Sequence, residues 1–260
     1  MMKYSFLLII FLSLLFWVGC SKTEMFDNID QLSQKTFAVP TGTIADQLVL
    51  SKFPDAKFAY YNSVLDACMA VKIGKADAAA YDEPILKNIA AKTSGLKVLP
   101  QMITFDNYGF AVRQDNLELK QSIDQVLSEL KANGTYDEMM QRWFPEHGAP
   151  AAMPEITFAN ETGILRFGTS SVTEPFSFVN SQGEVVGFDI ELAEYVAKAL
   201  GKELEIVNMD FGAMIPALMS GKVDLIGACI TISEERKKSV LFSEPYYIGG
   251  IAALVKDHKK

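Results

Sequence analysis

The chain has 260 residues, of which 49% are apolar and 22% are charged, a composition typical of a globular protein rather than a disordered or fibrous one. A chain of this length can bury a full hydrophobic core, in one large domain or in two smaller ones. The net charge of −8 argues against a nucleic-acid partner, because such a partner requires a basic face.

Residues 1–20 have the pattern of a signal peptide. Lys3 provides a positive charge, and the apolar run from Phe6 to Val18 is too short to span a membrane. The following WVGCS places a small residue before Cys20, which resembles the lipobox of bacterial lipoproteins, where this cysteine is lipidated. A plain secretory signal with an incidental cysteine is the alternative, since Trp17 departs from the usual leucine. We therefore expect a lipoprotein signal peptide and a periplasmic protein anchored to a membrane through Cys20.

Strand and helix patterns alternate from residue 36 onward, which predicts an α/β fold with largely parallel sheets. In the first part of the chain the expected strands are 36–39, 57–61, 76–81, 96–100 and 108–113. The expected helices are Thr43–Lys52, a helix capped by Asn62 that runs to Ile73, Pro84–Lys92, a long helix that Asp115 opens and that stops before Gly134, and 136–144.

The pattern is interrupted at residues 145–160, where prolines and small residues predict a semi-rigid linker. After the linker we expect strands at 164–169, 203–208, 223–228 and 250–256, and helices at 189–200 and 213–220. VKIGKADAAA (71–80) and LMSGKVDLIGA (218–228) share a Gly-Lys after a helix and an Asp before a buried strand. This similarity fits two related α/β lobes in one chain.

Cys68 and Cys229 are the cysteines that remain after the signal peptide. Export permits a disulfide, but Cys68 lies in an apolar helical stretch, so we expect two buried free thiols. His147 and His258 lie in the linker and the C-terminal tail, and no cluster has metal-ligand spacing. We therefore expect neither a metal nor another cofactor.

Several long stretches resemble the periplasmic solute-binding proteins of family 3, which capture polar amino acids for ABC transporters. The stretches that resemble that family's first lobe are FGTSSVTEPFSFVNSQGEVVGFDIELAEYVAKALG, MDFGAMIPALMSGKVDLI and ITISEERKKSVLFSEPYY. The stretches that resemble its second lobe and closing helices are TFAVPTGT, KADAAAYDEP and ELKANGTYDEMMQRWF. The resemblance covers residues 27–256 and implies a two-lobe periplasmic-binding-protein (type II) fold with a ligand cleft between the lobes.

The order of these segments is reversed relative to the family, which implies a circular permutation. In this interpretation lobe 2 is 27–108, the hinge strand and closing helices of lobe 1 are 109–144, and the remainder of lobe 1 is 161–256. A permutation is plausible where the old termini are exposed and close together, whereas halves of two tandem proteins would leave extra or missing elements. Because the new ends fall at one lobe crossing, we expect only the strand at 108–113 to join the lobes. We also expect the free protein to open widely about this hinge.

The family resemblance implies a site that pairs both charges of a free amino acid. Arg236 is the expected partner of the carboxylate, because a guanidinium matches a carboxylate in a planar, bidentate way. Asp82, at the carboxyl end of a strand, is the expected partner of the ammonium. The alternatives are that Arg236 is solvated beside its lysine neighbours and that Asp82 only caps a helix. The remaining expected ligand-binding residues are Thr231 and Thr43 at the carboxylate, Ala228 through its carbonyl, the aromatic wall Phe211, and Cys229, Thr173, Ser170 and Ile44.

The side-chain specificity stays open. Many relatives carry an aromatic residue at Thr173 and an Asp at Ser170, so this chain indicates a small or neutral-polar ligand. Glu174 would favour a basic ligand if it reached into the pocket.

We expect extracytoplasmic amino-acid binding, delivery to an ABC transporter permease, and no enzyme activity. One alternative is a cyclohexadienyl or arogenate dehydratase-like enzyme on the same fold, with Glu174 or Glu83 as general acid. The other is a ligand-sensing lipoprotein that signals to a membrane receptor.

Overall fold

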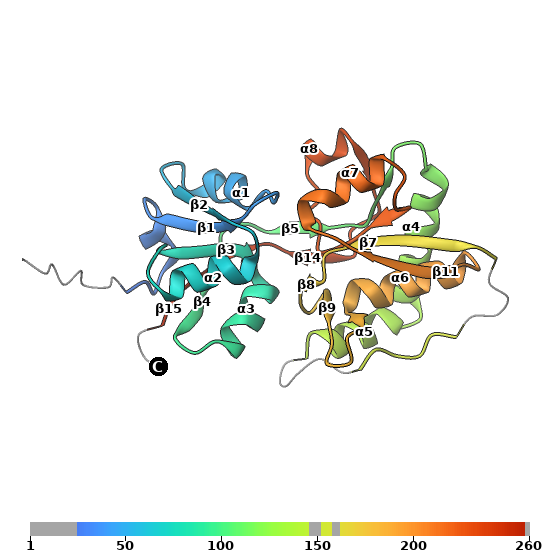
Figure 1. Cartoon of the computed structure of the whole chain (residues 1–260), viewed down its shortest axis with the longest axis horizontal. Coiled ribbons are helices and arrows are strands. Elements are labelled where there is room, and N and C mark those ends of the chain that lie inside the picture. Colours follow the sequence, from blue (N-terminus) through green and yellow to red (C-terminus); the bar gives the residue numbers. More distant parts are fainter. Residues whose placement is uncertain (1–24, 146–151, 158–161, 258–260) are drawn as a thin grey trace, which may run out of the picture.

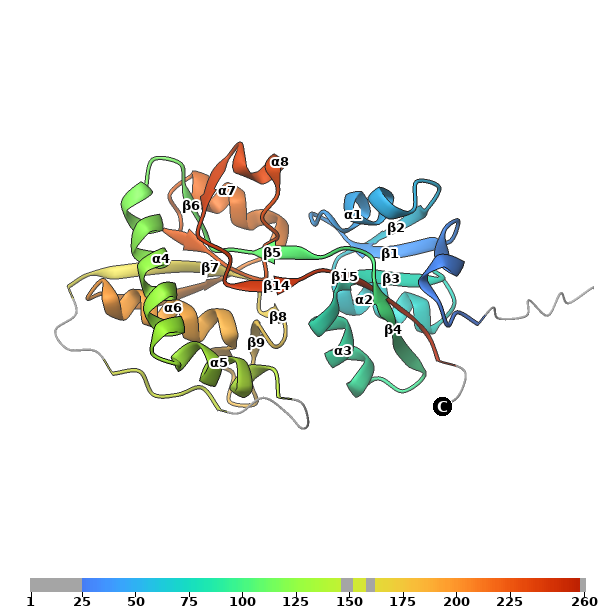
Figure 2. The ribbon, with the colours of Figure 1, turned by 180° about the vertical axis from the view of Figure 1, so that it is seen from behind.

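The computed structural model describes residues 25–145, 152–157 and 162–257, so the predicted signal peptide and Cys20 lie outside the described residues. Two α/β lobes are joined by a pair of extended strands (Figures 1 and 2). Within the described ranges, no helix is both long and apolar enough to cross a membrane.

Lobe 2 is built on a five-stranded sheet in the order β2-β1-β3-β15-β4. Its apolar strand β3, with the sequence AAAYD, is buried at every position, because helices cover both faces of the sheet. The first three strands are parallel, and β15 runs antiparallel to β3 and β4. The elements of this lobe are η1 (Ile29–Leu32), β1 (Thr36–Pro40), α1 (Ala45–Lys52), β2 (Lys57–Tyr61), α2 (Val64–Lys72), β3 (Ala78–Asp82), α3 (Glu83–Lys92), β4 (Leu96–Met102) and β15 (Ile251–Lys256).

Lobe 1 repeats this plan with a sheet in the order β11-β7-β12-β6-β13. Helices α4, α5 and α6 cover one face, and the short α7 packs with a separate apolar cluster on the other. A small sheet of β8, β9 and β10 projects toward lobe 2 (Figure 1). Its elements are β6 (Ala111–Arg113), α4 (Leu117–Ala132), α5 (Thr135–Trp143), β7 (Ile164–Thr169), β8 (Val172–Thr173), β9 (Ser177–Val179), β10 (Val185–Val186), α6 (Phe188–Ala199), β11 (Glu203–Asn208), η2 (Phe211–Ala213), α7 (Met214–Met219), β12 (Leu225–Ile226), α8 (Glu234–Lys237) and β13 (Val240–Phe242).

Two strands, not one, cross between the lobes. β5 (Asp106–Tyr108) follows β4 out of lobe 2, and β14 (Tyr247–Gly249) precedes β15 on the way into it. The two strands pair antiparallel, with Tyr108 opposite Tyr247. The expectation of a single crossing at 108–113 is therefore wrong, and with it the reason to expect unusually wide opening.

The assignment of 161–256 to lobe 1 is wrong at its C-terminal end for the same reason. Residues 251–256 form β15, which fills the gap between β3 and β4 in the lobe 2 sheet. Five of its six residues are buried, so this strand belongs to the core of lobe 2. The expected strand at 108–113 also divides into β5 and β6, because the Gly109 N–H bonds to the Ile230 carbonyl instead of continuing either ladder.

The alternation of strands and helices is confirmed, and two helix starts are corrected. The side chain of Ser63, not Asn62, caps α2 by accepting from the Asp66 N–H. Asn116, not Asp115, caps α4 through the Leu119 N–H. In each case the cap is the residue whose side chain reaches the free N–H groups of the first turn.

Candidate functional site

A small cavity between the lobes is lined by seven of the ten ligand-binding residues predicted from the sequence. Lobe 2 contributes residues from the start of α1, the end of β3 and the start of β15, and lobe 1 contributes residues from η2, α8 and the segment after β12. The cavity measures about 20 Å³, which is room for about one water molecule. A ligand as large as an amino acid therefore needs the lobes to move apart. The predicted residues that line it are Thr43, Ile44, Asp82, Phe211, Cys229, Thr231 and Arg236.

Arg236 is a buried cation at one side of this cavity. It is 8% exposed, its guanidinium donates to the Thr231 carbonyl at 3.0 Å, and it lies 5.4 Å from the centre of the Phe211 ring. Burial lowers the pKa of Arg236. Among the described residues it forms no ion pair, whereas Lys237 and Lys238 pair with glutamates of α8 at 2.7 Å. The structure therefore excludes the alternative of a solvated arginine and leaves its charge available to an anion.

Asp82 is a buried carboxylate that lines the same cavity from lobe 2. It is 5% exposed, the Tyr108 hydroxyl donates to its Oδ1, and the Cys229 thiol lies 3.9 Å from its Oδ2. Although Asp82 precedes α3, its side chain makes no capping hydrogen bond, so the helix-cap alternative is not realised. Burial raises the pKa of Asp82 to about 7, and the hydrogen bond from Tyr108 opposes this shift.

A second buried carboxylate holds the backbone at Cys229. This residue has a φ of +46°, a left-handed conformation that costs energy for a residue other than glycine. The Cys229 N–H donates to Asp189 Oδ2 at 2.9 Å, and the Tyr246 hydroxyl donates to the same oxygen at 3.0 Å. Asp189 is fully buried, which raises its pKa to about 7. Asp189 is not among the residues predicted from the sequence, although an aspartate in the apolar stretch VVGFDIELA is a detectable signal.

The two lobes meet at glycines beside the start of α1. A Cβ on Gly42, whose φ is +82°, would lie 3.0 Å from the Gly212 Cα of the other lobe, so this approach requires glycine. The Thr43 hydroxyl donates to the Pro40 carbonyl at 2.9 Å and is 3.4 Å from the Ala45 N–H. Thr43, Ile44 and Ala45, at the start of α1, thus line the same cavity as Arg236, and the N-terminus of a helix favours an anion.

Three predicted residues do not line this cavity. The Thr173 hydroxyl donates to the Ser170 carbonyl at 3.1 Å, and both residues are buried in the turn at β8. Ala228 is fully buried next to Cys229. Conversely, the cavity is also lined by Ala45, Tyr81 and Ile251, which were not predicted. Ile251 was missed because its strand was assigned to the other lobe.

Cys68 and Cys229 are free and buried, as predicted. Burial raises the pKa of Cys68 to about 12 and that of Cys229 well above its ordinary value, so neither thiol is a ready nucleophile.

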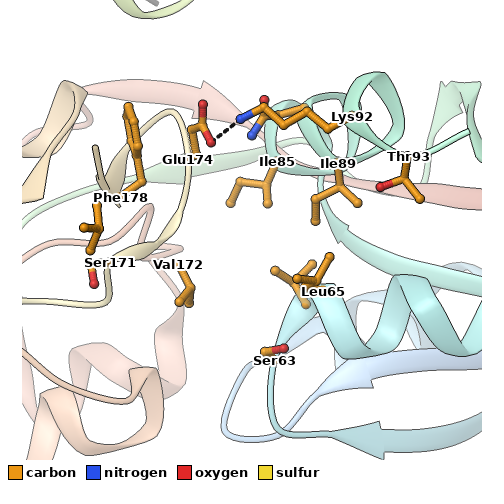
Figure 3. Close-up of a pocket in the computed structure, with 13 residues that line it drawn as sticks. Ser63, Leu65, Ile85, Ile89, Lys92, Thr93, Ser171, Val172, Glu174 and Phe178 are labelled. Carbon is orange, nitrogen blue, oxygen red and sulfur yellow. Dashed lines mark hydrogen bonds and ion pairs between the residues drawn. The ribbon is translucent and has the colours of Figure 1, made fainter. Parts of the chain in front are cut away.

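A larger cavity of about 490 Å³ lies between α2 and α3 of lobe 2 and the β8–β9 region of lobe 1 (Figure 3). Its walls are mostly apolar, with Leu65 and Ile85 facing Val172 across the gap. Lys92 of α3 and Glu174 of lobe 1 form an ion pair at 2.5 Å that joins the lobes at this cavity. Glu174 therefore faces Lys92, and it does not line the cavity of Arg236.

Two α/β lobes on a two-strand hinge, with buried charges between them, form the architecture of a hinge-bending binding protein. The model of the bacterial extracellular solute-binding proteins, family 3, matches residues 22–146 and 165–260. The chain belongs to this family.

The chain is also similar to individual amino-acid-binding proteins over part of its length. It is 42% identical to the L-cystine-binding protein TcyJ of Escherichia coli (strain K12) over 96 residues, which are 37% of this chain and 36% of that protein. It is 46% identical to the arginine-binding extracellular protein ArtP of Bacillus subtilis (strain 168) over 83 residues, 32% of each. It is 37% identical to the histidine-binding periplasmic protein of Escherichia coli (strain K12) over 83 residues, again 32% of each. The chain thus spans about a third of the length of these relatives.

The two buried carboxyl groups predict a dependence of stability on pH. The pKa values of Asp82 and Asp189 are about 7 in the folded protein, against about 4 in an unfolded chain. The folded state therefore binds more protons between these values, and the stabilisation is complete below pH ~4 and lost as the pH rises through about 7. We expect Asp82→Asn or Asp189→Asn to flatten the decline in the free energy of unfolding between pH 5 and pH 8, measured by urea denaturation without ligand. Curves for wild type and variants that stay parallel over this range would contradict the assignment.

Proposed function

We propose that this protein binds a free amino acid between its lobes outside the cytoplasm and delivers it to an ABC transporter. One observation carries the proposal: a buried guanidinium and a buried carboxylate line the same cavity without forming an ion pair with each other. Each charge is costly to bury without a partner. A zwitterion supplies the missing counter-charge to both, so closure around it is favoured.

In this proposal each end of the ligand has its own set of partners. Arg236, with the hydroxyl of Thr231 and the N–H groups that follow Thr43, binds the α-carboxylate. Asp82 binds the ammonium, helped by the backbone carbonyl near Ala228. Phe211, which already packs against the guanidinium, forms a wall for the ligand side chain. The names of the relatives, which bind cystine, arginine and histidine, support an amino acid as the ligand class.

The geometry favours binding over catalysis. Glu174 and Glu83, the general acids that a dehydratase would need, are paired with Lys92 and Lys87. Neither glutamate lines the cavity between Arg236 and Asp82. We therefore propose a binding protein without enzyme activity. We propose transport rather than signalling, because the relatives are named as binding proteins and a further relative is named ABC transporter arginine-binding protein 1, of Escherichia coli (strain K12).

The binding proposal is tested by thermal unfolding of residues 21–260 with individual amino acids at millimolar concentration. A ligand at ~100 times its Kd adds about 2.7 kcal/mol of stability, so we expect one or a few amino acids to raise Tm clearly.

Arg236→Ala should lower the affinity for that amino acid by roughly a hundredfold or more, because the substitution leaves the buried carboxylate of the ligand unpaired. Affinity should also fall roughly thirtyfold from pH 8 to about pH 5.5, as Asp82 takes up a proton. Lys237→Ala, on the exposed side of α8, is the control. No shift with any amino acid, in protein freed of carried-over ligand, would overturn the proposal.

We further propose that Cys20 is lipidated and anchors the protein to a bacterial membrane facing the periplasm. The support is the WVGCS pattern after an apolar run and the extracellular family. In a bacterial host, the wild type should incorporate labelled palmitate and sediment with membranes, and Cys20→Ala should do neither. Ser21→Ala, which leaves the cysteine in place, should behave as the wild type. Label retained in Cys20→Ala would contradict lipidation at this residue.

We also propose that the chain is a circular permutant of the family, with its new ends inside lobe 2. Lys256 pairs with Leu96 in the sheet, and the adjacent Lys97 forms an ion pair with Asp27, so the two described ends lie side by side. The family match leaves out 147–164, which contains most of the predicted linker.

A reordered protein that starts at residue 162, joins residue 257 to residue 25 through a short Gly-Ser loop and ends at residue 145 tests this permutation. We expect it to fold with a ligand affinity within about threefold of the parent, because the lobe contacts are kept. A loss above about tenfold in a folded product would contradict the proposal.

A further inference from the structure

We propose that Tyr108 is a positioning residue that ties the ammonium-binding carboxylate of Asp82 to both hinge strands. This inference rests on the proposed function, because it assigns Asp82 to the ligand. Tyr108 would not touch the ligand. It would hold the carboxylate in place and link its charge state to the geometry of the hinge.

The phenolic oxygen of Tyr108 connects three segments of the chain. Tyr108 lies on β5, the first crossing, and is fully buried. Its hydroxyl donates to Asp82 Oδ1 at the end of β3 and accepts from the Gly250 N–H, at 3.0 Å, in the second crossing. The Gly250 carbonyl in turn accepts from the Glu83 N–H at 3.1 Å. Both crossings are therefore bonded to the end of the strand that carries Asp82.

The second crossing is shaped to admit this tyrosine. A Cβ on Gly249 would lie 2.4 Å from the Tyr108 hydroxyl oxygen, so any larger residue would displace the ring. A Cβ on Gly250, whose φ is +147°, would lie 2.1 Å from the Thr104 carbonyl oxygen. The adjacent glycines thus let the second crossing pass close to both the phenol and the segment between β4 and β5.

The number of hydrogen bonds at the Tyr108 hydroxyl determines where its proton is donated. A tyrosine hydroxyl has one proton to donate, and here its oxygen already accepts from a backbone N–H. Its proton is therefore directed at Asp82, which favours the charged carboxylate that an ammonium ligand requires.

Several other groups face this carboxylate from the surrounding elements. Asp106 of β5 disfavours its charge and Arg236 of α8 favours it. The Cys229 thiol approaches the other oxygen at 3.9 Å, and Tyr81 and Tyr247 lie within electrostatic range. Tyr108 differs from all of these in belonging to the hinge while bonding directly to Asp82.

The test compares Tyr108→Phe with Tyr247→Phe in residues 21–260. Tyr247 is a matched control, because its ring stacks on Tyr108 with centroids 5.7 Å apart and lies opposite it in the hinge. Calorimetry with the amino acid that gives the largest Tm shift would measure affinity from pH 5.5 to 8.5. Tyr108→Phe should lose roughly tenfold at pH 7 and move the pH midpoint of binding upward from about 7. Tyr247→Phe should stay within about twofold of the wild type, with an unchanged midpoint.

A second readout needs no ligand. The carboxyl carbon of Asp82, assigned by comparison with Asp82→Asn, is titrated by NMR in the free protein, and its midpoint should rise in Tyr108→Phe. If that variant does not fold, 3-fluorotyrosine at position 108 keeps the ring and makes the phenol a stronger donor, so the midpoint should fall.

The outcomes separate this inference from the binding proposal. Equal midpoints and affinities in Tyr108→Phe and Tyr247→Phe, while Arg236→Ala abolishes binding, would overturn the role of Tyr108 and leave the binding proposal intact. Unchanged binding in Arg236→Ala would overturn the binding proposal itself. A shifted titration midpoint of Asp82 in the free protein would still support the conclusion that the hydrogen bond from Tyr108 controls the charge of Asp82.

Discussion

The structure depends on two opposite charges, Arg236 and Asp82, that are buried on either side of one cavity and do not pair with each other. Removing a charge from water is costly, and a direct ion pair would recover part of that cost. Because Arg236 and Asp82 do not pair, this part of the desolvation cost would be offset only by a ligand that carries both a positive and a negative charge. In the proposed function, closure of the lobes around such a ligand satisfies both charges at once, which couples closure to binding. The raised pKa of Asp82 and the lowered pKa of Arg236 are two expressions of the same burial.

The scaffold holds these charges in place with short, directional contacts. Each lobe presents the ends of parallel strands to the cleft, the position at which open α/β sheets place ligands. Asp189 holds the strained backbone of Cys229, and Ser233 caps the short helix that carries Arg236. Glycines at the crossing and at the lobe contact allow close approach where a side chain would not fit. Between the lobes the Lys92–Glu174 pair adds a contact that solvent reaches, so it is worth little compared with the buried groups.

The paired crossings also explain how the proposed circular permutation is compatible with a two-strand hinge. β5 and β14 come from distant parts of the sequence and still form a two-stranded ribbon. The described ends of the chain meet at β4, the edge strand of the lobe 2 sheet, and not at this ribbon. A break at that position leaves both crossings covalently intact. The hinge is thus defined by strand pairing, and the order in which the chain visits the lobes does not alter it.

The sequence by itself determined the alternating elements, the burial of both cysteines and most residues of the candidate site. These are local properties: a buried strand such as β3 is a continuous apolar run, and Asp82 and Arg236 lie in distinctive motifs. Only the tertiary structure decided that β15 belongs to lobe 2, that Tyr108 bonds Asp82, and that Ser170 and Thr173 do not line the cavity. The sequence of an apolar strand does not identify the strand that it pairs with, because pairing depends on hydrogen bonds between segments far apart in the chain. Contacts across the cleft depend on the relative position of the two lobes, and no local sequence pattern determines that position.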